Sequence, residues 1–315
     1  MATFEIIKCH GSGNDFIMVD TTRDVSLADV DWSAFAREAC SRSRGIGSDG
    51  VLLVVCDKEG VYGMDMLNPD GTHAEMCGNG IRCVARMAAE RGYLGAGILS
   101  SGGKHFAVSQ GEPLSEGIDT FAVSIPIATR SKSFPFIAEG ERFVGRRIDA
   151  LHPELEFTAL SLGNPHIVAR VESIDMALLG ALGERVIELK DIFPEGVNLS
   201  LYEVLSERSI FVATYERGAG ITLSCGTAMT ASATAASLLG YVERGERLDV
   251  VNRGGMVYCT PMIANDSIVT RLEGNATFEW WGEATFVDGA FSYVKHRDAG
   301  EQAVWQHFVS RINGK

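Results

Sequence analysis

The chain has 315 residues and a mass of 33.9 kDa, about twice the length of a typical single domain, so we expect two lobes. Its 28 Lys and Arg residues against 41 Asp and Glu residues give a net charge of −13, which argues against binding nucleic acid through its phosphates. No apolar run approaches the roughly 18 residues of a membrane-spanning helix, and the N-terminus lacks a basic stretch followed by an apolar one, so we expect a cytoplasmic protein with no membrane partner.

Strand-like and helix-like segments alternate along the first half of the chain. In chain order, the patterns predict strands at Phe4–Lys8 and Phe16–Asp20, a helix at Trp32–Ser43 with Asp31 as its N-cap, strands at Val51–Cys56 and Tyr62–Leu67, a helix at Gly78–Arg91, and mostly strands from Leu99 to about Ile127.

The second half follows a similar plan. In chain order, the patterns predict strands at Leu160–Val171, Val197–Val204 and Ser209–Tyr215, an Ala-rich helix at Gly226–Leu239, strands from Asp249 to about Phe286, and an amphipathic helix at about Gly300–Ile312 with Val304, Trp305, Phe308, Val309 and Ile312 on one face. Each half thus places a small-residue helix after a Cys-Gly pair, and Cys225 lies 148 positions after Cys77.

The chain has seven cysteines, an odd number, and they are widely scattered along the sequence. This pattern is typical of reduced thiols rather than of a disulfide framework. Neither a Cys-x-x-Cys nor a His-x-x-x-His spacing occurs, so we expect no structural zinc or other metal site. For four of the cysteines we favour an ordinary role as small buried apolar residues: Cys9, Cys40, Cys56 and Cys83.

Two short motifs call for a structural interpretation first. Gly45–Gly50 matches G-x-G-x-x-G, but a helix precedes it and a strand follows it, which is the wrong order for a dinucleotide site, so we interpret its glycines as turn residues. His73 lies near Cys77 in sequence, which leaves open a Cys/His nucleophile; a surface histidine is the simpler interpretation.

Cys77 and Cys225 differ from the other cysteines because each is followed by glycine at a predicted helix start. Free N–H groups and the helix dipole favour anions there, and up to about 2 kcal/mol, or roughly 1.5 pKa units, would bring a thiol pKa from about 8.5 towards 7. A small carboxylate held by both helix starts would have its α-carbon between the two thiols. One thiolate could then remove the α-proton while the other thiol delivers a proton to the opposite face.

Several longer motifs carry a family resemblance. Two stretches resemble the two active-site motifs of the diaminopimelate epimerase family: Asn68-Pro69-Asp70-Gly71-Thr72-His73-Ala74-Glu75-Met76-Cys77-Gly78-Asn79-Gly80-Ile81-Arg82-Cys83 and Glu216-Arg217-Gly218-Ala219-Gly220-Ile221-Thr222-Leu223-Ser224-Cys225-Gly226-Thr227. His10-Gly11-Ser12-Gly13-Asn14-Asp15-Phe16, Leu162-Gly163-Asn164-Pro165-His166 and Pro194-Glu195-Gly196-Val197-Asn198 are similar to its other loops. The chain is therefore identified as resembling cofactor-independent two-cysteine amino-acid epimerases and racemases.

The resemblance implies an α/β (α+β) fold of two pseudo-symmetric lobes, each a curled, mainly antiparallel sheet around a central helix, with the active site in the cleft between them. We expect residues 1–127 and about 287–315 to form the lobe that carries Cys77, and residues from about 128 to 286 to form the lobe that carries Cys225. It also implies an isomerase that converts LL- to meso-diaminopimelate in lysine and peptidoglycan synthesis, without pyridoxal phosphate or another cofactor.

By the same resemblance, Cys77 and Cys225 are the acid and base, and the backbone amides of four residues hold the α-carboxylate: Gly78, Asn79, Gly226 and Thr227. The distal end of the amino acid is bound by Asn14, Asn68, Asn164, Asn198, Glu216 and Arg217. This second set is chemically reasonable, since Arg217 offers a planar fork for a carboxylate and Glu216 an acceptor for an ammonium group.

The sequence departs from the family pattern at Ala228-Met229-Thr230-Ala231, around Ser48, in extra residues at about 130–157, and in a tail after about 296. A racemase of another amino acid, such as histidine, therefore remains an alternative. Acyl transfer by Cys77 and His73, or a non-catalytic protein on the same fold, are further alternatives. We expect a homodimer, with the tail helix covering either a sheet edge or a dimer contact.

Overall fold

The computed structural model describes residues 2–74, 76–129, 133–138, 141–265 and 267–314. The chain forms two compact units: unit 1 comprises Met1–Val123 and Glu273–Lys315, and unit 2 comprises Ser124–Leu272. The chain passes between the units within strands β8 (Thr120–Ile127) and β17 (Ser267–Asn275). The sequence placed these divisions near residues 127 and 286, because a hydrophobic pattern that continues through a strand does not mark where a unit ends.

The sheet of unit 1 is mainly antiparallel. Its strands, in spatial order, are β19 (Ala290–Asp298), β18 (Thr277–Val287), β1 (Ala2–Gly11), β2 (Asn14–Asp20), β3 (Gly50–Cys56), β4 (Tyr62–Leu67), β6 (Ile98–Ser101), β7 (Lys104–Gln110) and β8, with β5 (His73–Ala74) also beside β4. The pairs β2–β3 and β4–β6 are parallel. The continuous apolar run of β3 fits its place inside the sheet, where both faces are covered.

The sheet of unit 2 has strands β9 (Arg146–Arg147), β10 (Glu156–Ser161), β11 (Pro165–Arg170), β12 (Asn198–Ser206), β13 (Ser209–Glu216), β15 (Leu248–Asn252) and β16 (Gly255–Ala264), with β14 (Gly220–Thr222) beside β13. From β10 to β16 the pairings run antiparallel, parallel, antiparallel, parallel, antiparallel. The series from β1 to β7 is the same. The two units therefore repeat one topology. Cys77 and Cys225, which lie 148 positions apart, occupy equivalent places in this repeat.

A buried helix lies at the centre of each unit. Helix α2 (Gly78–Glu90) contacts β1, β2, β3, β4, β6 and β7, and its residues from Gly78 to Ala88 are buried. Helix α4 (Gly226–Leu238) contacts β10, β11, β12, β13, β15 and β16. Its buried residues are mostly Ala, Ser and Thr, and this explains how a helix can be enclosed on nearly every side. Gly92 and Gly240 follow these helices with φ of 73° and 76°, the left-handed conformation that ends a helix most easily at glycine.

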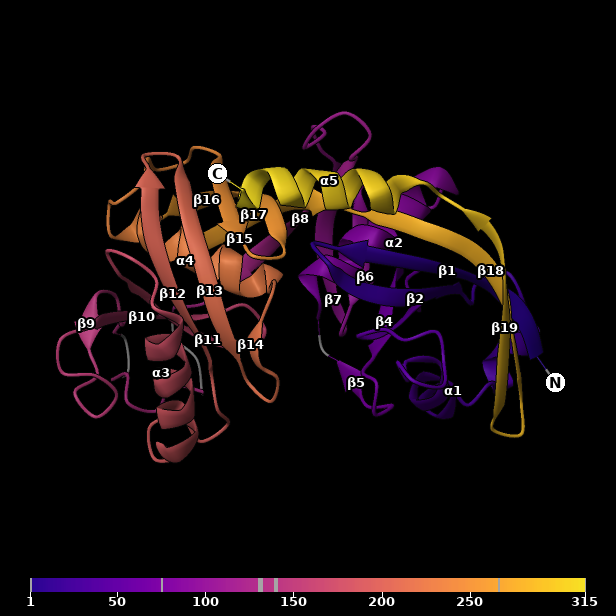
Figure 1. Ribbon diagram of the computed structural model, residues 1–315, viewed down its shortest axis with the longest axis horizontal. Coiled ribbons are helices and arrows are strands. Elements are labelled where there is room, and N and C mark those ends of the chain that lie inside the picture. The colour runs from indigo at the N-terminus through magenta and orange to yellow at the C-terminus, as the bar shows by residue number, and fades with distance from the viewer. Residues whose placement is uncertain (1, 75, 130–132, 139–140, 266, 315) are drawn as a thin grey trace. The chain divides into compact units, whose positions relative to one another are not determined.

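Three helices on the outside of the units differ in how well the sequence predicted them. Helix α1 (Trp32–Ala39) begins where expected, with the Asp31 carboxylate accepting from Ala34 N at 2.9 Å, but ends four residues before Ser43. Helix α3 (Met176–Glu188) was not predicted; it lies beside β12 and β13 in unit 2 (Figure 1). Helix α5 (Glu301–Asn313) lies along β18 in unit 1 (Figure 1).

Burial corrects two of the sequence predictions. On α5, Trp305 and Phe308 are buried, whereas Val304 is 38% exposed, so the apolar face is narrower than the pattern suggested. Cys9, Cys40 and Cys83 are buried as expected, but Cys56 is exposed because it stands at the end of β3. All seven cysteines are free thiols. Across the described residues, no helix has both the length and the apolar character to span a membrane.

Candidate active site

Cys77 is the N-cap of α2, with an extended backbone at φ −130° and ψ 112°. The N–H of Gly80 donates to Cys77 Sγ at 3.4 Å, so the thiol occupies the place of a capping side chain. Gly80 packs closely here, since a Cβ would lie 2.8 Å from Leu52 Cδ2 and the leucine side chain would have to shift. The sulfur is therefore held directly at the positive end of the helix.

Asn14 brings the glycine-rich loop between β1 and β2 to this helix start. Its Oδ1 accepts from Cys77 Sγ at 3.7 Å and from Asn79 Nδ2 at 3.3 Å, while its Nδ2 donates to Asp49 Oδ2 at 2.7 Å. Asp49 thus fixes which end of the Asn14 amide faces the thiol. Asn79 Oδ1 is buried and has no hydrogen-bond partner among the described residues, which leaves an acceptor open to a ligand.

Asn68 lies in the turn after β4, apart from this hydrogen-bonded group. Its side chain donates to Thr72 Oγ1 at 3.0 Å, and its backbone N–H donates to Thr72 O at 2.8 Å. His73, the second member of the alternative Cys/His pair, is exposed and its Nδ1 lies 2.9 Å from Asp65 Oδ1. The structure therefore engages His73 with a carboxylate rather than with a thiol. Glu75, within the first motif, lies outside the described residues.

Cys225 occupies the corresponding place in unit 2. It is the N-cap of α4, with φ −131° and ψ 109°, so its backbone matches that of Cys77 closely. Its Sγ lies 3.5 Å from Thr227 Oγ1, and Thr227 Oγ1 also accepts from Asn164 Nδ2 at 3.5 Å. Three of the expected residues of unit 2 are thus connected: the thiol, the first turn of the helix and the loop between β10 and β11.

The remaining expected residues of unit 2 surround the end of β13. Asn198 Oδ1 accepts from Arg217 N at 2.9 Å, and its Nδ2 donates to Pro165 O at 3.2 Å. Arg217 Nη1 donates to Glu195 O at 2.8 Å, while Glu216 Oε1 accepts from Thr222 Oγ1 at 2.5 Å. Thr222 was missed in the sequence, although its place opposite Thr214 in the β13–β14 hairpin brings it near the strand end.

Burial changes the expected ionisation of both thiols. It raises the pKa of Cys77 to about 11, although the N–H groups of Gly80 and Asn79 and the charge of Arg82 act to lower it. The pKa of Cys225 is also raised well above its usual value, first by burial and then by the carboxylate of Glu216. The expectation of a pKa near 7 is thus wrong for the protein without ligand, because loss of water outweighs the helix dipole.

His166 also belongs to the site, although the sequence gave it no role beyond its motif. Burial and the charge of Arg217 lower its pKa to about 3, so the imidazole is neutral. Its Nε2 lies 3.0 Å from Asn164 Oδ1, and its buried Nδ1 has no partner in the part of the chain that the structure describes. A neutral histidine can orient Asn164 without adding charge near Cys225.

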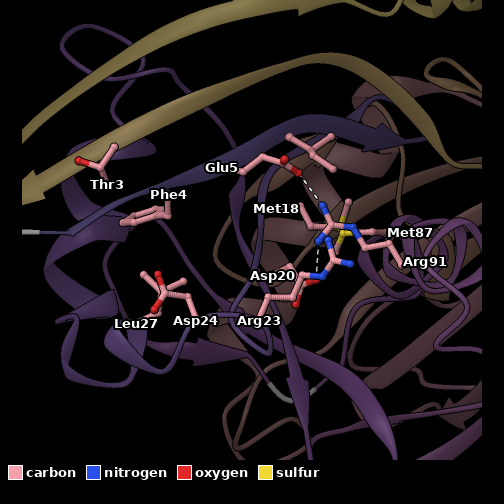
Figure 2. Close-up of a pocket in the computed structure, with 11 residues that line it drawn as sticks. Thr3, Phe4, Glu5, Met18, Asp20, Arg23, Asp24, Leu27, Met87 and Arg91 are labelled. Atoms are coloured by element: carbon pink, nitrogen blue, oxygen red, sulfur yellow. Dashed lines mark hydrogen bonds and ion pairs between the residues drawn. The ribbon is translucent and has the colours of Figure 1, made fainter.

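A cavity of about 260 Å³ in unit 1 lies at the other end of α2. Figure 2 shows Arg91 between two carboxylates, with ion pairs of 2.5 Å to Glu5 Oε1 and Asp20 Oδ2. Met87 also lines this cavity and Cys77 does not. Since α2 spans 13 residues, or roughly 20 Å, the cavity is remote from the thiol, and its paired charges favour a structural role.

Comparison with known proteins identifies the family. The family model described as diaminopimelate epimerase matches residues 6–103 and 158–279. The diaminopimelate epimerase of Clostridium acetobutylicum is 36% identical, covering 90% of this chain and 83% of that protein, and that of Enterococcus faecalis is 35% identical, covering 98% of both. The structure resembles a Bacillus anthracis phenazine biosynthesis protein of the PhzF family, with a TM-score of 0.63 at 14% identity, covering 91% of this chain and 100% of the other.

A hydroxyproline epimerase from Agrobacterium vitis is similar at a TM-score of 0.59 and 14% identity, covering 96% of this chain and 94% of that one. At such low identity, these two likenesses concern the fold alone, and they agree with the expected architecture of mixed helices and sheets. The sequence matches go further, since they extend over both cysteine motifs. The chain belongs to the diaminopimelate epimerase family.

Proposed function

We propose that this isomerase converts LL-diaminopimelate to meso-diaminopimelate by proton transfer at one α-carbon, with Cys77 and Cys225 as the two acid–base groups. One sulfur, as thiolate, takes the α-proton, and the electron pair moves into the α-carboxylate. The other sulfur, as thiol, gives its proton to the opposite face of the same carbon. The bond broken and the bond formed are both C–H bonds, so the reaction needs no oxidant, and we propose that it needs no cofactor.

The observation that carries this proposal is the equivalence of the two thiols. Each belongs to the N-cap residue of a buried helix in a repeated topology, with the same extended backbone and with glycine next in the chain, although only the Cys77 sulfur accepts a capping hydrogen bond. Two chemically similar groups suit a reaction whose forward and reverse directions differ only in which face loses the proton. A nucleophile–base pair would instead require two unlike partners.

The first turns of α2 and α4 are proposed to bind the α-carboxylate through the N–H groups of Gly78, Asn79, Gly226 and Thr227. Helix starts offer such groups because the first four N–H groups have no partner within the helix. The same donors stabilise the negative charge that enters the carboxylate when the α-proton leaves. This arrangement supplies stabilisation where the charge develops, in the manner of an oxyanion hole.

The distal ammonium and carboxylate of the substrate are assigned to Asn14, Asn68, Asn164, Asn198, Glu216 and Arg217. The planar guanidinium of Arg217 suits a carboxylate, and Glu216 suits an ammonium group. Asn198 supports this pairing, because its side chain holds the backbone of Arg217. A diamino dicarboxylic acid presents both charged groups at its far end, whereas histidine presents neither.

The high thiol pKa values give the substrate a second role. A thiol with a pKa of about 11 ionises rarely at neutral pH, so the thiolate must be stabilised when the substrate binds. The α-ammonium group of the amino acid is a positive charge next to the reacting carbon, and it is suited to that task. This requirement restricts proton abstraction to the loaded site.

The test is proton NMR in deuterium oxide with LL-diaminopimelate and a panel of amino acids that includes histidine and proline. We expect deuterium at one α-position of diaminopimelate and conversion to the meso isomer. Cys77→Ala and Cys225→Ala should each abolish conversion, while the exposed-site control Cys56→Ala should retain it. Turnover of histidine without diaminopimelate would replace the proposed substrate, and unchanged activity in either active-site variant would refute the two-thiol mechanism.

We further propose that the enzyme works in the cytoplasm as a homodimer. Seven free thiols fit a reducing compartment. Strand β19 pairs with β18 on one side and exposes Tyr293 by 43% and Val294 by 61%, which suits a second copy of the chain as its partner. Sedimentation equilibrium should then give twice the mass of 33.9 kDa, and a monomer would contradict the proposal.

A further inference from the structure

The C-terminal helix α5 lies outside the part of the chain that matches the family model, which ends at residue 279. Yet α5 makes specific polar contacts with the loop that carries Asn14. A series of hydrogen bonds connects Gln302 to His10, and His10 to the turn between β1 and β2. All of these residues lie within unit 1. These contacts connect the tail with the loop beside Cys77.

Gln302, in the first turn of α5, reaches the side chain of His10. Its Oε1 lies 2.7 Å from His10 Nε2, and because a carbonyl oxygen accepts, this contact is a hydrogen bond in the tautomer that carries its proton on Nε2. The unprotonated Nδ1 then accepts from Gly13 N at 3.3 Å and from Asn275 Nδ2 at 3.2 Å. These three contacts are compatible with one neutral tautomer of His10, in which Nε2 donates and Nδ1 accepts.

The turn that His10 supports is held in an unfavourable conformation. Ser12 and Gly13 have φ of 55° and 81°, as in a two-residue hairpin turn of type I′, and a left-handed conformation is unfavourable for serine. Ser12 is buried, with its N–H donating to Asn275 Oδ1 at 2.7 Å and its Oγ accepting from Arg82 Nη2 at 3.0 Å. External contacts therefore maintain the shape of this turn.

That turn sets the position of Asn14 at the thiol. Gly11 pairs with Asn14 across the hairpin, and a Cβ on Gly11 would lie 2.8 Å from Asn79 O, so the loop presses closely on the start of α2. Asn14 Oδ1 in turn faces Cys77 Sγ at 3.7 Å. If His10 moved, the turn would move with it, and so would Asn14, the hydrogen-bond partner of the Cys77 thiol.

Helix α5 is anchored firmly enough to act as a support. The carboxylate of Glu301 accepts from Arg86 Nη1 and Nη2 at 2.6 and 2.7 Å and from Phe278 N at 3.0 Å. The buried ring of Trp305 lies 5.5 Å from that of His10, centroid to centroid. Residues before and after Gln302 on α5, namely Glu301 and Trp305, are thus held in place, and the Gln302 amide has a fixed position.

We infer that Gln302 is a positioning residue: by accepting from His10 Nε2, it holds the 10–14 turn in the shape that sets Asn14 against Cys77. The inference rests on the proposed two-thiol reaction and adds to it a role for the tail. Gln302 touches neither thiol nor the proposed substrate, so it acts only through His10. Its loss should slow proton transfer at Cys77 more than it weakens substrate binding.

The charges around His10 support a neutral ring. Burial lowers its pKa to about 4; of the charged groups that face it, Asp15 on β2 raises the pKa, whereas Lys8 on β1 and Arg82 on α2 lower it. If the ring became doubly protonated, its Nδ1–H would point at two other donors, the N–H of Gly13 and the amide of Asn275. Protonation should therefore disrupt the turn.

The kinetic test compares Gln302→Leu, which removes the acceptor, with Gln306→Leu, an exposed glutamine one turn further along α5. We expect Gln302→Leu to lower kcat by about three- to tenfold, as for loss of one hydrogen bond, with a smaller rise in KM because Asn14 is also proposed to bind the substrate, and Gln306→Leu to match the wild type. Gln302→Glu keeps an acceptor, so kcat at pH 8 should recover, but the added negative charge should move the acidic limb of the pH profile to higher pH.

A second measurement does not depend on activity. With ¹⁵N-labelled histidine, the His10 signals, assigned with His10→Asn, should show the neutral Nε2-protonated tautomer in the wild type and a mixture in Gln302→Leu. Unchanged signals in folded Gln302→Leu, or equal losses of kcat in both leucine variants, would overturn the inference. If the wild type failed to epimerise diaminopimelate while the tautomer changed as expected, the proposed function would fail and the structural role of Gln302 would stand.

Discussion

The carboxylate of Glu216, at the end of β13, faces the thiol of Cys225 and opposes its ionisation, second only to burial. A negative charge disfavours a nearby thiolate, so this contact acts together with burial to raise the pKa of Cys225. The same carboxylate is proposed to bind the distal ammonium of the substrate. Ligand binding would then reduce the influence of Glu216 on Cys225.

The substitution Glu216→Gln tests this relationship. Removing the negative charge should lower the pKa of Cys225, so iodoacetamide should modify Cys225 faster at pH 8 than in the wild type. Modification is followed by mass spectrometry of the peptide that contains Cys225. The exposed Glu207→Gln serves as the control, and equal rates in both variants would contradict a direct effect of Glu216.

Close contact between the loop and α2 predicts a strong effect of Gly11→Ala. A Cβ at Gly11 would meet Asn79 O at 2.8 Å and Arg82 Nη2 at 2.9 Å, so the start of α2 must move. We expect a loss of about 1–3 kcal/mol in the free energy of unfolding, together with reduced epimerase activity. Gly95→Ala, where a Cβ meets no atom within 4 Å, should leave both unchanged. Similar urea midpoints for the two variants would argue against the close contact.

Asp15 predicts how stability depends on pH. Burial would raise its pKa, but the hydrogen bonds from Arg42 and the charge of Lys8 prevail and lower the pKa to about 2. A carboxyl group with a lowered pKa stabilises the folded state above its unfolded value of about 3.9, and this contribution is lost as the pH falls towards 2. Stability should therefore decline over that acidic range.

Comparing Asp15→Asn with the wild type isolates this contribution. At pH 7 the variant should lose about 1–3 kcal/mol in the free energy of unfolding, because Lys8 and Arg42 lose their partner. The difference should shrink when urea titrations are repeated at pH 3. A difference that stays constant between pH 7 and pH 3 would show that charge is not the cause, and exposed Asp149→Asn provides the control.

The two-thiol proposal predicts sensitivity to oxidation. If Cys77 and Cys225 act on one carbon, an oxidant should join them as a disulfide when no substrate is present. Activity should fall after treatment with oxidised glutathione and return with dithiothreitol, and substrate should protect against the loss. Activity that is indifferent to both reagents would count against the arrangement of the thiols.

Local patterns in the sequence predicted much of the fold. Tyr62–Leu67 was predicted with the observed bounds, and the helix after Cys77 was placed to within one residue, since Gly92 signals its end. Leu160–Val171 was expected as one strand, but Gly163 at φ 97° turns the chain and divides it into β10 and β11. Helix α3 was missed because Gly180 and Gly183 lower its helix propensity, although Asp175 caps it as a typical N-cap.

The sequence motifs predicted some of the contacts within each unit but not their energetics, and the roles of the site residues stay predictions. Asn14 and Asn79 meet at Cys77, and Asn164 and Thr227 meet near Cys225, as expected for residues of a common site within each unit. The predicted direction of the thiol pKa shifts was wrong, because the shift depends on how much water the surrounding strands exclude from the thiols. The hydrogen bond from His10 Nε2 to Gln302 Oε1, across 292 positions of sequence, likewise leaves no local pattern.

The discontinuous make-up of unit 1 has a consequence for synthesis on the ribosome. Strand β1 is made first, yet its neighbour β18 starts at residue 277, after the whole of unit 2 has been translated. At roughly 5–20 residues per second, the nascent β1 waits on the order of tens of seconds with one edge uncovered. Unit 2, being continuous, can mature first, and a truncated or stalled chain would leave the N-terminal segment prone to aggregation or to capture by chaperones.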